Sequence, residues 1–143
     1  KLKHNINKSL VKNKSVTLID DSLVRGTTSV KIIKMLYESG AKEVHLRIAS
    51  PPIKFPDYYG VDTPSQNELL ASKLDIEGMR KFINAKSLDF LSIDGLYKSM
   101  GYDKRNPLYP QFTDHCFTGE YPVEPIDIKI NKGLRTTLLS NKK

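Results

Sequence analysis

The sequence contains a single cysteine, Cys116, among its 143 residues. One thiol cannot form an internal disulfide, and this cysteine content gives no sign of an oxidising compartment. No apolar run approaches the roughly 20 residues that a membrane helix needs. The first fifteen residues, KLKHNINKSLVKNKS, lack the apolar stretch of a signal peptide. We therefore expect one cytoplasmic domain with no membrane contact.

Acidic residues are absent from both ends of the chain, and this bears on the net charge of +7. Residues 1–14 contain five Lys, and residues 129–143 contain five Lys or Arg. Between these ends, thirteen basic side chains face sixteen acidic ones. A nucleic-acid-binding protein usually gathers its basic residues on one folded face. We therefore expect solvated or partner-contacting ends and no nucleic-acid partner.

Two common nucleotide-binding motifs are also missing. No glycine is followed, after four residues, by Gly-Lys-Ser/Thr, and G-x-G-x-x-G does not occur. These absences exclude a Walker A loop and the dinucleotide-binding fingerprint.

The first half of the chain predicts alternating strands and helices. Val16–Ile19 is β-branched and continuously apolar, as in a strand covered on both faces. The segment after it has apolar side chains at helical spacing, with Thr27 or Thr28 as its cap and Gly40 at its end. Residues 43–50 alternate between apolar and polar and predict a second strand. This order indicates a right-handed strand–helix–strand unit with parallel strands.

Shorter elements follow a loop at 51–63 that is rich in Pro and aromatic residues. A helix is predicted to start at Thr63, with Pro64 at its first position and Gln66 three residues after the cap. Three further elements are expected: a helix capped by Asp75, a strand at 87–92 and a helix at 92–101. Turns follow, and beyond Ile130 we expect disorder.

Two adjacent carboxylates, Asp20 and Asp21, end the first predicted strand. In a parallel α/β sheet, ligands bind beyond the carboxyl ends of the strands. Neighbouring carboxylates repel each other unless a cation or hydroxyl donors lie against them. Shortly after them, Gly26 allows close backbone approach, and the Thr27 and Thr28 hydroxyls and the helix N–H groups suit an anion.

One end of this loop therefore suits Mg²⁺ or sugar hydroxyls. The other end, about one ribose length away, suits a phosphate, and Arg25 adds a positive charge nearby. A phosphorylated sugar satisfies both ends. The alternative is a solvated turn followed by an ordinary helix cap, which is common for an isolated Asp-Asp pair but leaves the Arg-Gly-Thr-Thr step unexplained.

The stretch VTLIDDSLVRGTTS resembles the phosphoribosyl-pyrophosphate (PRPP) signature of type I phosphoribosyltransferases. Further segments extend the resemblance to the amidophosphoribosyltransferase family: LIDDSLVRGTTS, RIASPPIKFPDYYGVDTPSQNELLA, LDFLSIDGL and CFTGEYP. It covers nearly all of residues 1–122 and corresponds to the C-terminal third or so of those enzymes. It implies an α/β type I phosphoribosyltransferase fold, a parallel sheet with flanking helices, incomplete at its N-terminal side and followed by a C-terminal helical or irregular extension.

The resemblance also implies an activity, the first step of de novo purine biosynthesis. That reaction makes 5-phosphoribosylamine, pyrophosphate and glutamate from PRPP, glutamine and water. It implies purine nucleotides as feedback inhibitors and a homo-oligomer when the enzyme is complete. Nothing here resembles the family's N-terminal glutaminase domain or the first strands of its transferase domain. We therefore expect a cut chain, or one half of a split enzyme whose N-terminal half is supplied in cis or as a separate chain, with little or no turnover by this chain alone.

Carried over residue by residue, the family's metal-binding acids fall on Asp20 and Asp21. The resemblance implies that they hold Mg²⁺ and the ribose hydroxyls of PRPP. The loop for the 5′-phosphate falls on residues 22–28. Its expected PRPP contacts are Ser22, Val24, Arg25, Gly26, Thr27 and Thr28.

The resemblance also divides the chain. Lys3 and Asn5 match the end of the flexible loop that closes over PRPP, with a basic disordered end as the alternative. The implied boundaries are a loop and linker remnant at 1–15, the transferase portion at 16–128 and a disordered tail at 129–143.

Some family members carry a 4Fe–4S cluster, and two of its cysteine regions match FPDYYG and TDHCFTG in this chain. Asp57 stands where one ligand would be, and Thr113 where a cysteine pair needs its first sulfur. Only Cys116 remains, and one thiol cannot hold a cluster that normally takes four, so we expect none. His115 beside it is weak evidence for zinc. We interpret Cys116 as structural.

Several alternatives stay open at this point. Tyr58 and Tyr59 border the predicted cleft, but packing beneath their Pro-rich loop is the favoured interpretation of both. A PRPP- or nucleotide-binding regulatory module without catalysis is an alternative function, although no DNA-binding domain accompanies it. A type I transferase acting on a free base is another, and the ASPPIKFP and CFTGEYP segments count against it.

Overall fold

Three parallel strands form a single sheet in the order β1–β2–β3. The structure is a computed structural model that describes residues 6–61 and 63–123. The strands are β1 (Ser15–Asp20), β2 (Glu43–Ile48) and β3 (Ser87–Phe90). Asp20, the last residue of β1, lies opposite Ile48, the last residue of β2. The parallel α/β arrangement predicted from the sequence is confirmed, and the strand ends that carry the loops meet at one edge.

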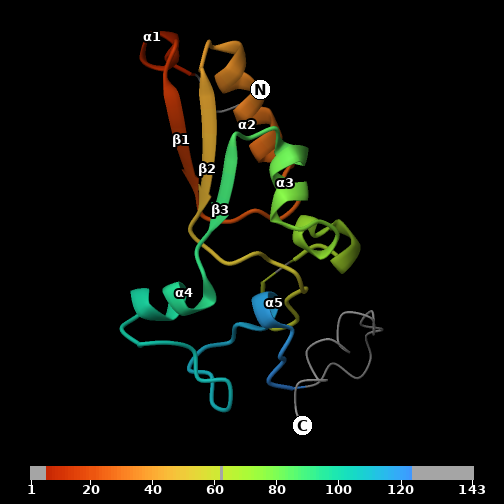
Figure 1. Ribbon diagram of the computed structural model, residues 1–143. Coiled ribbons are helices and arrows are strands. Elements are labelled where there is room, and N and C mark those ends of the chain that lie inside the picture. The colour runs from red at the N-terminus through yellow and green to blue at the C-terminus, as the bar shows by residue number, and fades with distance from the viewer. Residues whose placement is uncertain (1–5, 62, 124–143) are drawn as a thin grey trace.

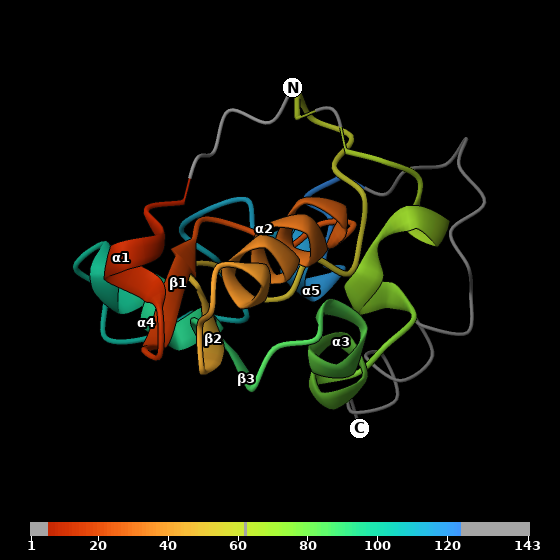
Figure 2. The ribbon, with the colours of Figure 1, turned by 90° about the horizontal axis from the view of Figure 1, so that it is seen from above.

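Two helices, α2 (Thr27–Glu38) and α3 (Ile76–Ile83), lie together on one face of this sheet (Figure 1, Figure 2). The side chains of β2 that point toward them, Val44, Leu46 and Ile48, are buried in the core. Because apolar burial is the main favourable term in folding, this interface fixes the sheet against the helices. It thereby fixes the loop that joins β1 to α2.

The continuous apolar run of β1 does not lie between two layers. Its residues alternate between exposed and half-buried along the strand. Val16 and Leu18 pack against the core, whereas Ile19 is 73% exposed on the opposite face. The prediction of a strand covered on both faces is therefore wrong for the described residues, because α2 and α3 cover the same face.

Several predicted helix ends are confirmed, and two are corrected. Gly40, after the end of α2, has a φ of 92°, and the Asp75 side chain accepts a hydrogen bond from the Gly78 N–H at 2.7 Å at the start of α3. However, the N-cap of α2 is Gly26, with a φ of 76°, and not Thr27 or Thr28. Both threonine hydroxyls therefore remain outside the cap.

The helix predicted to start at Thr63 is also corrected. Two short 3₁₀ turns, η1 (Gln66–Glu68) and η2 (Leu70–Ser72), occupy this segment, and Ser65 precedes the first. The Thr63 hydroxyl instead accepts a hydrogen bond from the Asp57 N–H at 2.6 Å. That contact closes the aromatic loop, so Thr63 belongs to the loop and not to a helix cap.

The remaining elements are three short helices. They are α1 (Lys8–Val11), α4 (Ile93–Ser99) and α5 (His115–Thr118). In Figure 1, α4 and α5 lie beyond the carboxyl ends of the strands, among turns. The residues predicted as a disordered tail lie outside the described residues. Within the described part of the chain, every helix is too short or too polar to cross a membrane.

Candidate functional site

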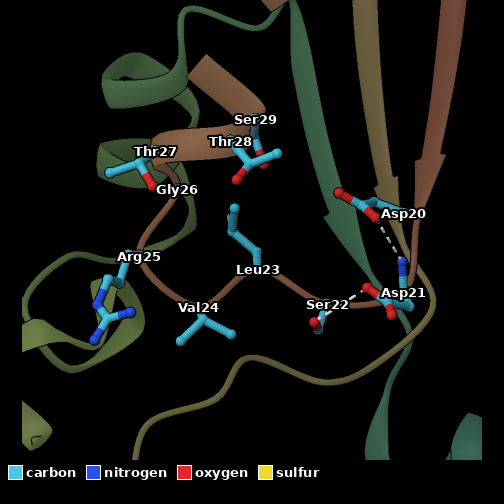
Figure 3. A pocket seen from close by; sticks show the side chains of 10 residues that line it. All are labelled: Asp20, Asp21, Ser22, Leu23, Val24, Arg25, Gly26, Thr27, Thr28 and Ser29. Atoms are coloured by element: carbon cyan, nitrogen blue, oxygen red, sulfur yellow. Dashed lines mark hydrogen bonds between the residues drawn. The ribbon is translucent and has the colours of Figure 1, made fainter. Parts of the chain in front are cut away.

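A cavity of about 310 Å³ lies beyond the carboxyl end of β1, at the start of α2 (Figure 3). Ten consecutive residues line it, from Asp20 to Ser29. The structure thus brings together all the loop residues that the sequence singled out. It adds Ser29, which lies beyond the predicted loop, and Leu23, which lies within 22–28 but was not among the expected contacts.

Among residues 6–61 and 63–123, the two carboxylates at the strand end accept hydrogen bonds only within their own turn. Asp20 Oδ1 accepts a hydrogen bond from the Asp21 N–H at 3.1 Å, and Asp21 Oδ1 accepts one from the Ser22 hydroxyl at 3.2 Å. Among the residues that the structure describes, no basic side chain forms an ion pair with either. Their remaining acceptor positions are available to a ligand.

The opposite side of the cavity is the N-terminus of a twelve-residue helix. The first helical hydrogen bond runs from the Val30 N–H to the Gly26 carbonyl at 2.9 Å. No side chain in the described segments caps this end. The N–H groups of the first turn and the hydroxyls of Thr27 and Thr28 are therefore free to meet an anion, which the helix dipole also favours.

The middle of the loop is held by contacts to other elements. Leu23 is 2% exposed and belongs to the core, and the Val24 carbonyl accepts a hydrogen bond from the Leu70 N–H at 2.8 Å. Gly26 lies so close to α3 and η2 that an added Cβ would meet Phe82 and Leu70 side-chain atoms at 3.1 and 3.0 Å. The loop is therefore a fixed framework between the carboxylates and the helix.

Arg25 has a definite partner within the protein. Its Nη2 lies 3.0 Å from Glu68 Oε1, and its Nε–H donates to the same oxygen at 3.1 Å. Figure 3 shows its side chain pointing away from the space between Asp20 and Thr28. Glu68 lies 43 positions further along the chain, and nothing in the sequence marks it as a partner of Arg25.

The donor set at the strand end fits Mg²⁺. Mg²⁺ usually binds through one or two carboxylates, with waters and substrate oxygens completing its coordination. Asp20 and Asp21 offer two such carboxylates at the edge of an open cavity, and no basic side chain of the described ranges pairs with them. In the described ranges, no group of three or more His, Cys, Asp or Glu is arranged to hold a metal by itself. This fits a metal that is shared with a ligand.

The aromatic loop lies away from this cavity. Tyr59 meets the His115 ring edge-on, with ring centres 5.0 Å apart, and Tyr58 packs on Tyr121 at 5.4 Å. Neither Tyr58 nor Tyr59 lines the cavity, so packing is the alternative that the structure supports. His115 is 1% exposed, and its Nε2 lies 3.3 Å from Asp57 Oδ2, in a geometry that does not make a hydrogen bond.

Of the remaining candidate residues, the structure describes Cys116 and Thr113 but not Lys3 and Asn5. Burial, and then the charge of Asp57, raises the pKa of Cys116 to about 11, so the thiol is protonated at neutral pH and suits the structural interpretation. Thr113 is exposed, close to Cys116 in sequence. Lys3 and Asn5 lie outside the described residues.

Comparisons with known proteins agree on one family. No protein-family model matches the chain. The chain is 57% identical to an amidophosphoribosyltransferase of Rhizobium etli over 128 residues, which are 89% of this chain and 26% of that protein. It is 50% identical to amidophosphoribosyltransferase 1, chloroplastic, of Arabidopsis thaliana over 133 residues, 93% of this chain and 23% of that protein.

A solved structure gives the same result. The glutamine PRPP amidotransferase of Bacillus subtilis, complexed with ADP and GMP, superposes with a TM-score of 0.76 at 46% identity. The match covers 86% of this chain and 27% of that one. The chain thus spans about a quarter of the length of the relatives that it matches. Over that span it belongs to the amidophosphoribosyltransferase family, in the phosphoribosyltransferase portion of these proteins.

Proposed function

We propose that this chain is the PRPP-binding portion of an amidophosphoribosyltransferase. The complete enzyme makes 5-phosphoribosylamine, pyrophosphate and glutamate from PRPP, glutamine and water. The observation that carries the proposal is that the Asp20 and Asp21 carboxylates and the uncapped N-terminus of α2 border one cavity. Because the chain spans a quarter of its relatives, we assign the reaction to the complete protein and only sugar-phosphate binding to this chain.

The two ends of the loop take different parts of the ligand. Asp20 and Asp21 accept hydrogen bonds from the ribose hydroxyls, since both have free acceptor positions facing the cavity. The 5′-phosphate binds to the loop at 22–28, mainly at the first turn of α2. There the N–H groups and the Thr27 and Thr28 hydroxyls supply donors. The ligand therefore lies across the short loop from carboxylates to helix.

When bound at Asp20 and Asp21, Mg²⁺ would neutralise their charge and attract the oxygens of the ligand. The protein side chains orient the ribose and fix its 5′ end. Binding a sugar phosphate in one orientation is the part of the reaction that we assign to this loop.

The same ribose 5-phosphate group occurs in purine nucleoside monophosphates. We therefore propose that purine nucleotides compete with PRPP for this loop and act as feedback inhibitors of the complete enzyme. We further propose that the complete enzyme is a cytoplasmic homo-oligomer and carries no iron–sulfur cluster at Asp57, Thr113 and Cys116.

Calorimetry with PRPP, in the presence and absence of Mg²⁺, tests the proposal on the full 143-residue chain. We expect weak binding that depends on Mg²⁺. The double variant Asp20→Asn with Asp21→Asn should lose this dependence, because an amide is a much poorer Mg²⁺ ligand than a carboxylate. Asp89→Asn, on the exposed side of β3, is the matched control and should bind like the wild type. Identical PRPP binding by the wild type and the double variant would overturn the proposed metal and ribose roles.

A further inference from the structure

The loop at 22–28 is attached to a second segment at three consecutive residues. Val24 is bonded through its carbonyl to Leu70, Arg25 is paired with Glu68, and Gly26 lies against Leu70 and Phe82. Two of these contacts involve the backbone. The contact of Arg25 is the only one of the three that depends on charge.

Glu68 is itself held in place before it meets Arg25. One carboxylate oxygen, Oε2, accepts hydrogen bonds from the Ser65 hydroxyl at 3.0 Å and from the Ser65 N–H at 3.3 Å. The other oxygen, Oε1, is directed at the Arg25 guanidinium. The hydrogen bond from Ser65, and then that from Arg25, lowers the pKa of Glu68, so this carboxylate stays charged at neutral pH. A carboxylate fixed in this way loses little side-chain freedom when it pairs with arginine.

We propose that Glu68 is a positioning residue for the phosphate end of the site. It holds the Arg25 guanidinium away from the space between Asp20 and Thr28 and thereby keeps the 22–28 loop in the shape that presents the first turn of α2 to the 5′-phosphate. This inference rests on the proposed function, because it assumes that the loop binds a phosphate ester. It gives Arg25 a role through Glu68 and not through direct contact with the ligand.

A direct role for Arg25 leads to the opposite expectation. If the guanidinium bound the phosphate, Glu68 would compete with the ligand for the same group. Removing the charge of Glu68 would then release Arg25 and strengthen binding. If Glu68 positions the loop, removing its charge weakens binding. The two roles therefore differ in the sign of one measured effect.

The test measures ribose 5-phosphate binding to the full chain by calorimetry in the presence of Mg²⁺. The variants are Glu68→Gln, Arg25→Gln and the two combined. Because half-exposed ion pairs contribute little, we expect each single change to weaken binding about fivefold. The combined variant should be no weaker than the singles, since both changes break the same contact.

Two controls separate positioning from general damage to the fold. Mg²⁺ binding at Asp20 and Asp21, measured without sugar phosphate, should be unchanged in Glu68→Gln. Glu77→Gln removes another Glu–Arg pair, on α3 and away from the loop, and should leave ribose 5-phosphate affinity at the wild-type value. A parallel loss of Mg²⁺ and ribose 5-phosphate binding in Glu68→Gln would overturn the positioning role.

The outcomes also distinguish this inference from the proposed function. If the wild type binds ribose 5-phosphate while Glu68→Gln binds equally well or more tightly, only the positioning role of Glu68 fails. Additive losses in the combined variant would also overturn it, because they would show two independent contacts. If the wild-type chain binds neither ribose 5-phosphate nor PRPP with Mg²⁺, the proposed function itself fails and this inference fails with it.

Discussion

Two groups of charged side chains in this protein are used in opposite ways. Beyond the carboxyl ends of the strands, near α4 and α5, Arg105 donates hydrogen bonds to both carboxylate oxygens of Asp114 and, at 2.7 Å, to Glu120. The Tyr97 hydroxyl donates to the same Asp114 at 2.9 Å, and Asp114 is 3% exposed. At the cavity, the carboxylates of Asp20 and Asp21 find hydrogen-bond donors only in their own turn, within the part of the chain that the structure describes. One group has its partners inside the protein, and the other leaves acceptor positions open.

The contrast shows which charges stabilise the fold and which are available to a ligand. Burial alone would raise the pKa of Asp114, but hydrogen bonds from Arg105 and Tyr97 lower it on balance. The hydrogen bond to Asp114, and then that to Glu120, raises the pKa of Arg105. A buried ion pair that is fully hydrogen-bonded holds the segments around α4 and α5 together. The strand-end carboxylates have no comparable role in packing.

Replacing Asp114 with Asn should give the largest loss of stability. It leaves the buried Arg105 charge without its main partner, which typically costs about 3 kcal/mol. Urea unfolding of the chain measures this change. The control is Asp89→Asn, which breaks the exposed pair between Arg47 and Asp89 and should cost less than about 1 kcal/mol. Equal losses would show that the buried group contributes no more than a surface pair.

The pH dependence of stability tests the same group. The folded-state pKa of Asp114 lies below its ordinary value of 3.8. The charged carboxylate therefore adds stability above that value, and this contribution is lost as the pH falls through the folded-state pKa. The wild type should lose stability in this acid range more steeply than Asp114→Asn. If the unfolding free energies of the wild type and Asp114→Asn fell in parallel with pH, Asp114 would not be the group responsible for the loss.

A medium effect is expected from Gly26→Ala at the cavity. Alanine at a φ of 76° is strained, and its Cβ would also meet Leu70 and Phe82, for a loss of about 1–2 kcal/mol. Gly101→Ala is the matched control, since its φ is 89° but nothing lies within 4 Å of the added carbon. A larger loss at Gly26, with weaker ribose 5-phosphate binding, would show that the contact matters beyond the backbone strain. Equal losses of stability in the two variants would show that the contact with Leu70 and Phe82 adds nothing to the backbone strain.

The smallest effect on stability is expected where the effect on binding is greatest. The double variant Asp20→Asn with Asp21→Asn should unfold within about 0.5 kcal/mol of the wild type, because neither carboxylate forms an ion pair with any residue that the structure describes. Removing two neighbouring negative charges can even stabilise the fold slightly. Thermal unfolding in the absence of Mg²⁺ measures this. A loss of unfolding free energy above about 1 kcal/mol would mean that Asp20 and Asp21 stabilise the fold, as Asp114 does. The two groups of charges would then no longer differ in role.

The sequence predicted the order of elements because local signals marked most of them. A β-branched apolar run located β1, the alternation of apolar and polar residues located β2, and helical spacing located α2, while Asp75 marked the start of α3. The coverage of β1 was misjudged, because an apolar run does not state how many faces are covered. Ile19 is exposed although Leu18, directly before it, packs on the core.

The cavity was also predictable, since all its lining residues are contiguous in sequence. What sequence reasoning missed depends on contacts between distant residues. The Arg25–Glu68 pair, 43 positions apart, and the Tyr97–Asp114 hydrogen bond, 17 positions apart, are examples. The cap of α2 was misassigned because Gly26 takes a left-handed conformation, and threonine is the commoner cap. Local chemistry is visible in the sequence, whereas pairing across the fold is not.

The contiguity of the cavity has a further consequence for ligand choice. Asp20 and the first turn of α2 are anchored in the sheet and in the helix layer, and five residues of backbone, from Asp21 to Arg25, separate Asp20 from Gly26. The number of residues in this loop therefore sets the distance between the carboxylates and the helix N-terminus. Inserting or deleting one residue in that stretch would change the length of ligand that fits between the two ends, without altering the sheet.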